Sequence, residues 1–305
     1  MLALLKRDAL PQLTSQQLVC RMDEALETEH AKEARRKEER LADWLQQQRS
    51  VLLGFSGGVD SAYLGSVAVE CLGPDRVLAV IGRSPSYPAV QWATAREVAE
   101  RVGLPILELD THEMDDPRYA ANPTNRCYFC KTELWTVLER VARERGFETI
   151  VDGSNADDRA DWRPGARAAK EHEVRSPLAE VGMTKAEIRF LSRLRGLPTW
   201  ATPSSPCLSS RLPYGTAVTA PRLQQVESAE SALRELGVTG NLRVRHHGDL
   251  ARVEMDRSEL AEWLEPARLP VLRAAVSAAG FARVAVDLRG FRSGSLNVLS
   301  GVSAG

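Results

Sequence analysis

Residues 51–61 read Val51-Leu52-Leu53-Gly54-Phe55-Ser56-Gly57-Gly58-Val59-Asp60-Ser61, and this stretch decides the fold of the chain around it. Its apolar first half predicts a short buried strand, and residues 62–71 have a helical pattern. A strand, a glycine turn and a helix N-terminus form an anion site, because free backbone N–H groups point at the ligand. No Gly-Lys-Ser/Thr of a Walker loop follows. We therefore expect residues 56–61 to bind phosphate groups in another way.

The six residues Ser56, Gly57, Gly58, Val59, Asp60 and Ser61 resemble the PP-loop of ATP pyrophosphatases. Enzymes of this class use ATP to adenylate a carbonyl or carboxylate and release pyrophosphate. The alternative is an ordinary glycine turn ahead of a core helix, but the strand–turn–helix context favours the PP-loop. The resemblance implies that all six residues bind ATP, and that Asp60 acts in catalysis with Mg²⁺.

Composition narrows the class of protein. Of 305 residues, 43% are hydrophobic and 27% charged, as expected of a globular chain long enough for two cores. A formal net charge of −1 gives no overall attraction to RNA or to an anionic membrane. No apolar run approaches the ~18 residues of a membrane helix, and the N-terminus lacks a signal-peptide pattern. We expect a cytoplasmic protein that binds neither nucleic acid nor membrane.

Short apolar segments alternate with helical patterns in the first two thirds of the chain. Strands are expected at 51–54, 77–81, 105–109 and 149–151, with helices at 62–71, 89–101, 131–145 and 185–195. This alternation predicts an α/β fold, with a parallel sheet covered by helices on both faces. Ligands of such sheets bind at the carboxyl ends of the strands. By the PP-loop resemblance, Ser84, Gly153 and Asn155 at those ends contact ATP, although each also suits a plain turn.

The remaining segments predict three parts of the chain. Residues 15–48 have a helical pattern, and we treat residues 1–34 as an N-terminal helical extension. The PP-loop domain spans 35–212. A turn-rich stretch at 213–216 opens a small α+β domain, 213–305, with helices at 221–237, 258–264 and 269–279 and strands at 242–246, 251–255 and 283–287.

Two arginines of the small domain are two residues apart on an expected strand. Arg243 and Arg245 therefore lie on one face of it. Two guanidinium groups so placed can bind one phosphate. The alternative is a basic strand face exposed to solvent.

Three of the five cysteines lie in segments rich in turn formers. Cys127 and Cys130 form a Cys-x-x-Cys in a loop that enters a helix, and Cys207 lies in a loop with two prolines and four serines. An odd count without a secretion signal does not indicate a disulfide framework. The Cys-x-x-Cys spacing fits half a zinc site, a redox pair, or two ligands of an iron–sulfur cluster.

Six segments together resemble the LarE family, and the resemblance covers roughly residues 35–299. They are residues 54–61, 122–131, 152–158, 175–179, 206–211 and 290–297. The resemblance implies an ATP-dependent sulfur transferase that adenylates and thiolates the carboxylates of pyridinium-3,5-biscarboxylic acid mononucleotide. That reaction belongs to the biosynthesis of the nickel-pincer nucleotide, the cofactor of lactate racemase. The family also implies a homo-oligomer.

The same resemblance implies two sources for the sulfur. In one, Cys207 attacks the adenylate, gives up its own sulfur and becomes dehydroalanine. In the other, Cys127, Cys130 and Cys207 hold a [4Fe–4S] cluster whose fourth iron binds sulfide from a donor. Three cysteines leave one iron open and so favour the cluster. A redox pair beside a sacrificial Cys207, and a zinc site, are the alternatives.

The family resemblance also implies binding roles for basic side chains. Arg126 is expected at the ATP site, and four further arginines are expected to bind the nucleotide substrate: Arg211, Arg243, Arg245 and Arg292. Glu254 is implied to join a metal or intersubunit site.

Three other functions remain open. A PP-loop tRNA thiolase needs a long basic surface, which the net charge does not favour. An amide-forming synthetase has no need of three loop cysteines. A non-enzymatic iron–sulfur scaffold would bind ATP without releasing pyrophosphate.

Overall fold

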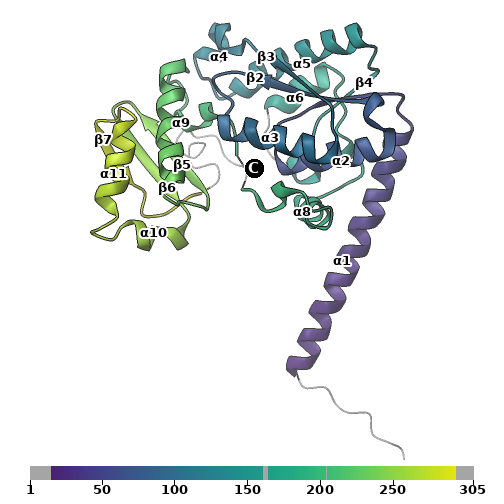
Figure 1. Cartoon of the computed structure of the whole chain (residues 1–305), viewed down its shortest axis with the longest axis horizontal. Helices are drawn as coiled ribbons and strands as arrows, with labels where there is room; N and C mark the ends of the chain where they lie inside the picture. The colour runs from purple at the N-terminus through teal and green to yellow at the C-terminus, as the bar shows by residue number, and fades with distance from the viewer. Residues whose placement is uncertain (1–14, 161–163, 204, 293–305) are drawn as a thin grey trace, which may run out of the picture.

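The computed structural model describes residues 15–160, 164–203 and 205–292. Figure 1 shows two bodies side by side, and the long helix α1, Ser15–Gln46, extends away from the larger one. No helix in these ranges is long and apolar enough to cross a bilayer.

The larger body is built on a four-stranded parallel sheet. Its strands are β1 (Val51–Gly54), β2 (Val77–Arg83), β3 (Ile106–Asp110) and β4 (Thr149–Val151). The spatial order is β3-β2-β1-β4. The chain adds β2 and β3 on one side of β1 and then returns to add β4 on its other side. The glycine loop, residues 56–61, follows β1 and therefore lies at the switch point where ligands of such sheets bind.

Helices cover both faces of this sheet, as the alternating pattern predicted. One face packs against α1, α2 (Val59–Leu72), α3 (Ala89–Val102) and α8 (Lys185–Leu194). The other packs against α5 (Arg126–Arg145) and α6 (Pro164–Glu171). In β1, Val51 and Leu53 point to the first face and Leu52 to the second, so all three side chains are buried. The predicted α/β fold is confirmed.

Helix α5 begins earlier than the sequence predicted. Residues 122–131 were expected to be a loop, but α5 already starts at Arg126. Only Pro123 resists helix in this stretch, and its carbonyl accepts the N–H of Arg126 at 3.0 Å. Cys127 and Cys130 therefore lie on the first two turns of a helix, and α5 fixes their spacing.

The smaller body has a three-stranded mixed sheet. Strands β5 (Leu242–His247) and β6 (Leu250–Met255) are antiparallel, and β7 (Arg283–Val286) pairs with β6 in parallel. Apolar side chains of α9 (Ala220–Glu235) and α11 (Leu269–Ala278) pack on one face of this sheet. Helix α10, Arg257–Trp263, covers one end through Leu260 and Trp263.

The two bodies share their packing where the chain passes between them. Tyr119 of α4 (Pro117–Ala120) joins the apolar core of the smaller body together with Leu208 and Leu212. The fully buried Asn122 donates from Nδ2 to the carbonyls of Pro213 at 2.8 Å and Thr216 at 2.9 Å. These contacts hold the segment after Cys207 against the start of α5.

Candidate active site

The glycine loop leaves the N-terminus of α2 free to bind an anion. Gly58 occupies the N-cap position, and no side chain caps it. The hydroxyl groups of Ser56 and Ser61 lie 3.2 Å apart, and the Ser61 hydroxyl donates to the carbonyl of Gly58 at 3.2 Å. Unpaired N–H groups and two hydroxyls thus gather at one helix end, where the helix dipole also favours negative charge.

Two close approaches require glycine in and beside this loop. Gly57 has φ +65°, and a Cβ added to it would meet Cβ of Ala95 at 2.6 Å. Gly153, which follows β4, lies against the glycine loop, since an added Cβ would be 2.9 Å from the backbone nitrogen of Ser61. The structure therefore brings Gly153 to the glycine loop, as the sequence predicted.

Two side chains that the sequence analysis missed hold the glycine loop from α3 and the segment before it. Tyr87 Oη and Gln91 Nε2 both donate to the carbonyl of Ser56, at 3.0 and 2.8 Å. No local pattern marks these residues, because they lie more than 30 positions from Ser56 and meet it only when β2 pairs with β1.

Asp60 on the first turn of α2 is the acidic group closest to this anion site. Its Oδ2 accepts from Lys185 Nζ at 2.5 Å, while Oδ1 is buried with no hydrogen-bond partner among the described residues. Burial raises the pKa of Asp60, against the opposing charge of Lys185. An unpartnered carboxylate oxygen beside a phosphate site is a hard ligand of the kind that Mg²⁺ prefers. Asp60 therefore fits the magnesium role expected from the sequence.

Lys185 is a third functional side chain that the sequence analysis missed. It opens α8, which begins with a capping box of reciprocal contacts between Thr184 and Glu187. Its backbone N–H donates to Asp157 Oδ2 at 2.8 Å. The same turn after β4 holds Asn155, which is 3% exposed and accepts the N–H of Asp157 at 3.0 Å. Asn155 thus shapes this turn from inside.

Ser84, expected to border the adenosine, is part of a buried polar cluster. Its hydroxyl donates to Oε1 of Glu113 at 2.5 Å and lies 2.8 Å from the hydroxyl of Ser86. Ser86 also donates to Glu113 Oε1, at 2.9 Å. Its carbonyl in turn accepts the N–H of Leu208 at 2.8 Å, so the segment after β2 touches the residue next to Cys207.

The three cysteines singled out from the sequence lie near one another. Burial raises the pKa of both Cys127 and Cys130, and the charge of Cys207 raises each further. Cys127 and Cys130 project from α5, and Cys207 comes from the loop at 205–211, here called the Cys207 loop. Within the ranges described, no three His, Cys, Asp or Glu side chains are arranged to hold a metal ion. The thiol set suits an iron–sulfur cluster in its chemistry, but its present spacing is not that of a formed metal site.

Arg126 lies with these cysteines. Its side chain is 4% exposed, and its Nη1 donates to Asn122 Oδ1 at 2.5 Å and to the carbonyl of Ser209 at 3.0 Å. Its positive charge lowers the pKa of Cys127 against the effect of burial. We infer that Arg126 supports the Cys207 loop and a negative charge on sulfur, and its expected contact with ATP stays a prediction.

Three of the four expected phosphate-binding arginines, Arg211, Arg243 and Arg245, form a buried layer at and behind the end of the Cys207 loop. Arg211 pairs with Glu230 through two bonds of 2.9 Å, and Arg245 Nη1 donates to the carbonyl of Ser210 at 3.0 Å. Arg245 also pairs with Glu254, which accepts from Arg252 as well. Arg243 and Arg245 are each 5% exposed, so the alternative of a solvent-exposed basic face is wrong.

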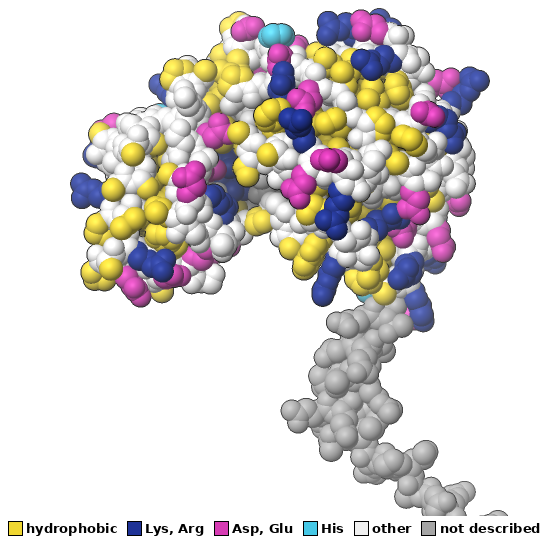
Figure 2. All heavy atoms as spheres, in the orientation of Figure 1, with side chains coloured by type: hydrophobic (Ala, Val, Ile, Leu, Met, Phe, Trp, Pro, Cys, Tyr) yellow, Lys and Arg dark blue, Asp and Glu magenta, His cyan; other side chains and the backbone are white. Residues whose placement is uncertain are grey.

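Two further features belong to this layer. Burial, with the nearby charge of Arg211, lowers the pKa of Arg243 to about 10, and its guanidinium lies 5.2 Å from the ring centre of Phe291. Arg292 is half-exposed, with its guanidinium 3.9 Å from Asp287. Figure 2 shows a notch in the surface where the two bodies meet, and basic and acidic side chains are interspersed over this face.

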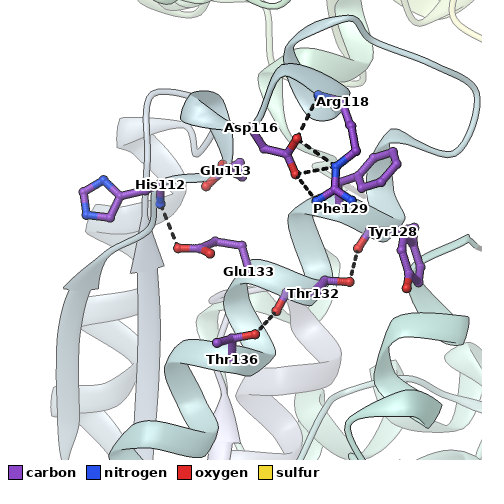
Figure 3. Close-up of a pocket in the computed structure, with 9 residues that line it drawn as sticks. All are labelled: His112, Glu113, Asp116, Arg118, Tyr128, Phe129, Thr132, Glu133 and Thr136. Carbon is purple, nitrogen blue, oxygen red and sulfur yellow. Dashed lines mark hydrogen bonds and ion pairs between the residues drawn. The ribbon is translucent and has the colours of Figure 1, made fainter.

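A separate cavity of about 170 Å³ lies between α5 and the segment after β3. Figure 3 shows its lining, which comes from residues 112–118 and from α5. Glu113 lines it, and so does Glu133, which accepts the N–H of His112 at 3.2 Å. Glu113 therefore lies between this cavity and the cluster of Ser84 and Ser86.

Comparison with known proteins decides the family. A pyridinium-3,5-bisthiocarboxylic acid mononucleotide synthase from Lactiplantibacillus plantarum is 33% identical over 253 residues, which cover 83% of this chain and 91% of that enzyme. The chain belongs to the LarE family of PP-loop proteins. An uncharacterised protein from Synechocystis sp. is 42% identical over 261 residues, covering 86% of this chain and 97% of that protein.

The LarE-family glycine loop also matches a wider set of ATP-using enzymes. The family model for NAD synthase matches residues 35–125. An NH₃-dependent NAD⁺ synthetase from Methanosarcina mazei is 36% identical over 76 residues, which is 25% of this chain and 30% of that enzyme. These matches identify this LarE-family chain as an ATP-using enzyme.

We expect Gly153→Ala to weaken binding of ATP by about tenfold or more, because the added methyl group would push the glycine loop out of position. Isothermal titration calorimetry with Mg²⁺ and a non-hydrolysable ATP analogue measures this. Gly103→Ala is the control, since its φ of +65° makes alanine destabilising while nothing lies within 4 Å of the added Cβ. An equal loss of affinity in both variants would contradict a local effect.

Proposed function

We propose that this LarE-family enzyme is an ATP-dependent sulfur transferase that acts on the carboxylates of pyridinium-3,5-biscarboxylic acid mononucleotide. The contact between the segment after β2 and the Cys207 loop carries this proposal, because it joins a nucleotide site to a cysteine. The name of the L. plantarum relative supports the acceptor. The proposed setting is nickel-pincer nucleotide biosynthesis, in the cytoplasm and in a homo-oligomer.

The first step that the site supports is adenylation. A carboxylate is a poor electrophile, and transfer of AMP from ATP turns one of its oxygens into part of a good leaving group. The free N–H groups of α2 and the hydroxyls of Ser56 and Ser61 would bind the departing pyrophosphate. Asp60 would hold Mg²⁺, which when bound neutralises charge on the phosphates. Lys185, paired with Asp60, adds positive charge at the same place.

The second step needs a sulfur nucleophile near the adenylate. In the sacrificial route, the Cys207 thiolate attacks the acyl carbon, a C–S bond forms, and the C–O bond to AMP breaks. Loss of the Cα proton of Cys207 then breaks its Cβ–S bond, leaving a thiocarboxylate and dehydroalanine. Arg126 would stabilise negative charge on the cysteines of this region, since its guanidinium is buried beside them.

The three thiols also support the cluster route as part of this proposal. Cys127, Cys130 and Cys207 would hold a [4Fe–4S] cluster, which when bound supplies an iron that can carry sulfide from an external donor. Arg211, Arg243, Arg245 and Arg292 would bind the phosphate of the substrate nucleotide. Glu254 accepts from two arginines, so it would orient this layer.

An amide-forming synthetase is the second candidate, because the NAD synthase model matches the glycine loop. Such an enzyme transfers ammonia and leaves the three grouped cysteines without a use. A tRNA thiolase is not favoured by the mixture of charges in Figure 2.

We expect Asp60→Asn to lower the affinity for Mg·ATP about tenfold or more, because the amide keeps the shape but not the charge that would hold Mg²⁺. The measurement is titration of ATP at several Mg²⁺ concentrations, with the thermal midpoint of unfolding as a check on folding. Asp157→Asn is the control, because the Asp157 carboxylate accepts from the backbone N–H of Lys185 and not from its side chain. Unchanged dependence on Mg²⁺ in Asp60→Asn would contradict the assignment.

We expect the enzyme to release pyrophosphate from ATP only with the biscarboxylate nucleotide present, and Cys207→Ala to retain this release while forming no thiolated product. Adenylation depends on the glycine loop, which makes no contact through the Cys207 side chain. A coupled pyrophosphate assay and chromatography of the nucleotide measure the two steps. Release of ADP would refute the proposed chemistry, and amide formation with ammonia would favour the synthetase.

The mass of the Cys207 peptide after one turnover distinguishes the sulfur sources. The protein is reconstituted with iron and sulfide without oxygen, then given Mg·ATP and the biscarboxylate nucleotide. If product forms and the peptide has lost the elements of hydrogen sulfide, Cys207 is the sulfur source. If product forms while the peptide is intact, we expect sulfide from the cluster to be the source.

A further inference from the structure

One short turn connects the two halves of this site. Residues 84–87, here called the bridging turn, follow β2 and close on themselves through the N–H of Tyr87 and the carbonyl of Ser84. On one side, Tyr87 Oη donates to the carbonyl of Ser56 in the glycine loop at 3.0 Å. On the other, the Ser86 carbonyl accepts the N–H of Leu208 at 2.8 Å. The position of Cys207 relative to the nucleotide loop therefore depends on this turn.

Glu113 holds the bridging turn from beneath. It is 3% exposed and comes from the segment after β3, the strand that neighbours β2. Its Oε1 accepts from the hydroxyls of both Ser84 and Ser86, at 2.5 and 2.9 Å. This one oxygen accepts from two side chains and so fixes two of the turn's four residues.

The other carboxylate oxygen marks Glu113 as more than a packing residue. Oε2 is buried and has no hydrogen-bond partner among the described residues. Burying a carboxylate oxygen without a partner is unfavourable, and buried polar groups in proteins are nearly always hydrogen-bonded. The charge of Glu113 also adds to the effect of burial in raising the pKa of the Cys130 thiol.

A second contact holds the Cys207 loop on the same side. The hydroxyls of Tyr119 and Ser209 are 2.7 Å apart, and both side chains are buried. The loop is thus attached at Leu208 through the bridging turn and at Ser209 through α4. Removing the Glu113 contact would release the attachment beside Cys207 while the attachment at Ser209 keeps the loop folded.

We propose that Glu113 is a positioning residue that sets, through the bridging turn, the reach from the sulfur of the Cys207 loop to the adenylate on the glycine loop. This proposal rests on the proposed sulfur transfer. It assigns Glu113 no contact with ATP and no part in adenylation. The transfer step is sensitive to it, because a displacement of about 1 Å between reacting groups lowers a rate by about a hundredfold.

The first test needs no substrate. Glu113→Ala should raise the rate at which N-ethylmaleimide alkylates Cys207 by about fivefold, because the loop beside it opens more often. Peptide mass spectrometry compares the alkylation rate of Cys207 with that of Cys71, which lies in α2 and should react at an unchanged rate. Glu133→Ala is the matched variant, since Glu133 lines the same cavity without touching the bridging turn. An unchanged Cys207 rate in Glu113→Ala, or an equal rise in Glu133→Ala, would overturn the proposal.

The second test separates the two steps of the reaction. In Glu113→Ala, formation of thiolated nucleotide should fall about tenfold more than pyrophosphate release does, because Tyr87 still holds the glycine loop through the carbonyl of Ser56. Glu113→Gln should restore part of the transfer rate, because its amide oxygen still accepts from Ser84 and Ser86. Equal losses in both steps would overturn the proposal. If the unsubstituted enzyme makes no thiolated product, the proposed function fails, whereas the alkylation result still reports on Glu113.

Ser86→Ala provides the same test should Glu113→Ala fail to fold. It removes one of the two hydroxyl groups that donate to Glu113 Oε1, and it leaves the Ser86 carbonyl that accepts the N–H of Leu208. Faster alkylation of Cys207 with normal release of pyrophosphate would support the proposal. Unchanged alkylation and unchanged transfer would overturn it.

Discussion

The uncapped N-terminus of α2 is the constraint on which the rest of this structure depends. No side chain among the described residues caps its N–H groups, so they are free to bind an anion. Keeping them accessible requires a loop without bulky side chains, and it requires neighbours that come close without covering the helix end. Gly57 and Gly153 meet this requirement, since a Cβ on either would strike the backbone or side chain of a neighbouring element. The parallel order of the strands then brings the turns after β2 and β4 to the same edge.

Asp60 at this helix end and Glu113 beneath the bridging turn each have one carboxylate oxygen in contact and one buried without a partner among the described residues. Asp60 uses Oδ2 for Lys185, and Glu113 uses Oε1 for Ser84 and Ser86. An apolar side chain in either place would avoid the unfavourable burial of charge. Their presence is understandable if one oxygen awaits a cation and the other positions a loop, because protein active sites commonly retain groups that reduce stability.

The sequence predicted the elements well because their signals are local. Apolar runs, the glycine loop and the capping box at Thr184 each lie within a dozen residues, and the expected parallel sheet followed from their alternation. The early start of α5 was missed, since Pro123 and the polar residues around it resemble a loop that continues. Lys185, Tyr87 and Glu113 were missed for another reason. Each meets its partner only after strands distant in the chain have paired, so no spacing in the sequence marks them.

The buried arginine layer shows the same limit and suggests how a phosphate would bind. The alternation of side chains along a strand predicted that Arg243 and Arg245 lie on one face of β5. It did not predict whether another element would bury that face. Burial and the neighbouring Arg211 and Arg245 lower the pKa of Arg243, which means that its charged form is less favourable there than in water. An arriving phosphate would relieve that repulsion, since it adds negative charge among the three guanidinium groups. Glu230 and Glu254 already balance part of the layer. The phosphate would therefore bind by completing an existing charge balance, and it would do so directly behind the loop that carries Cys207.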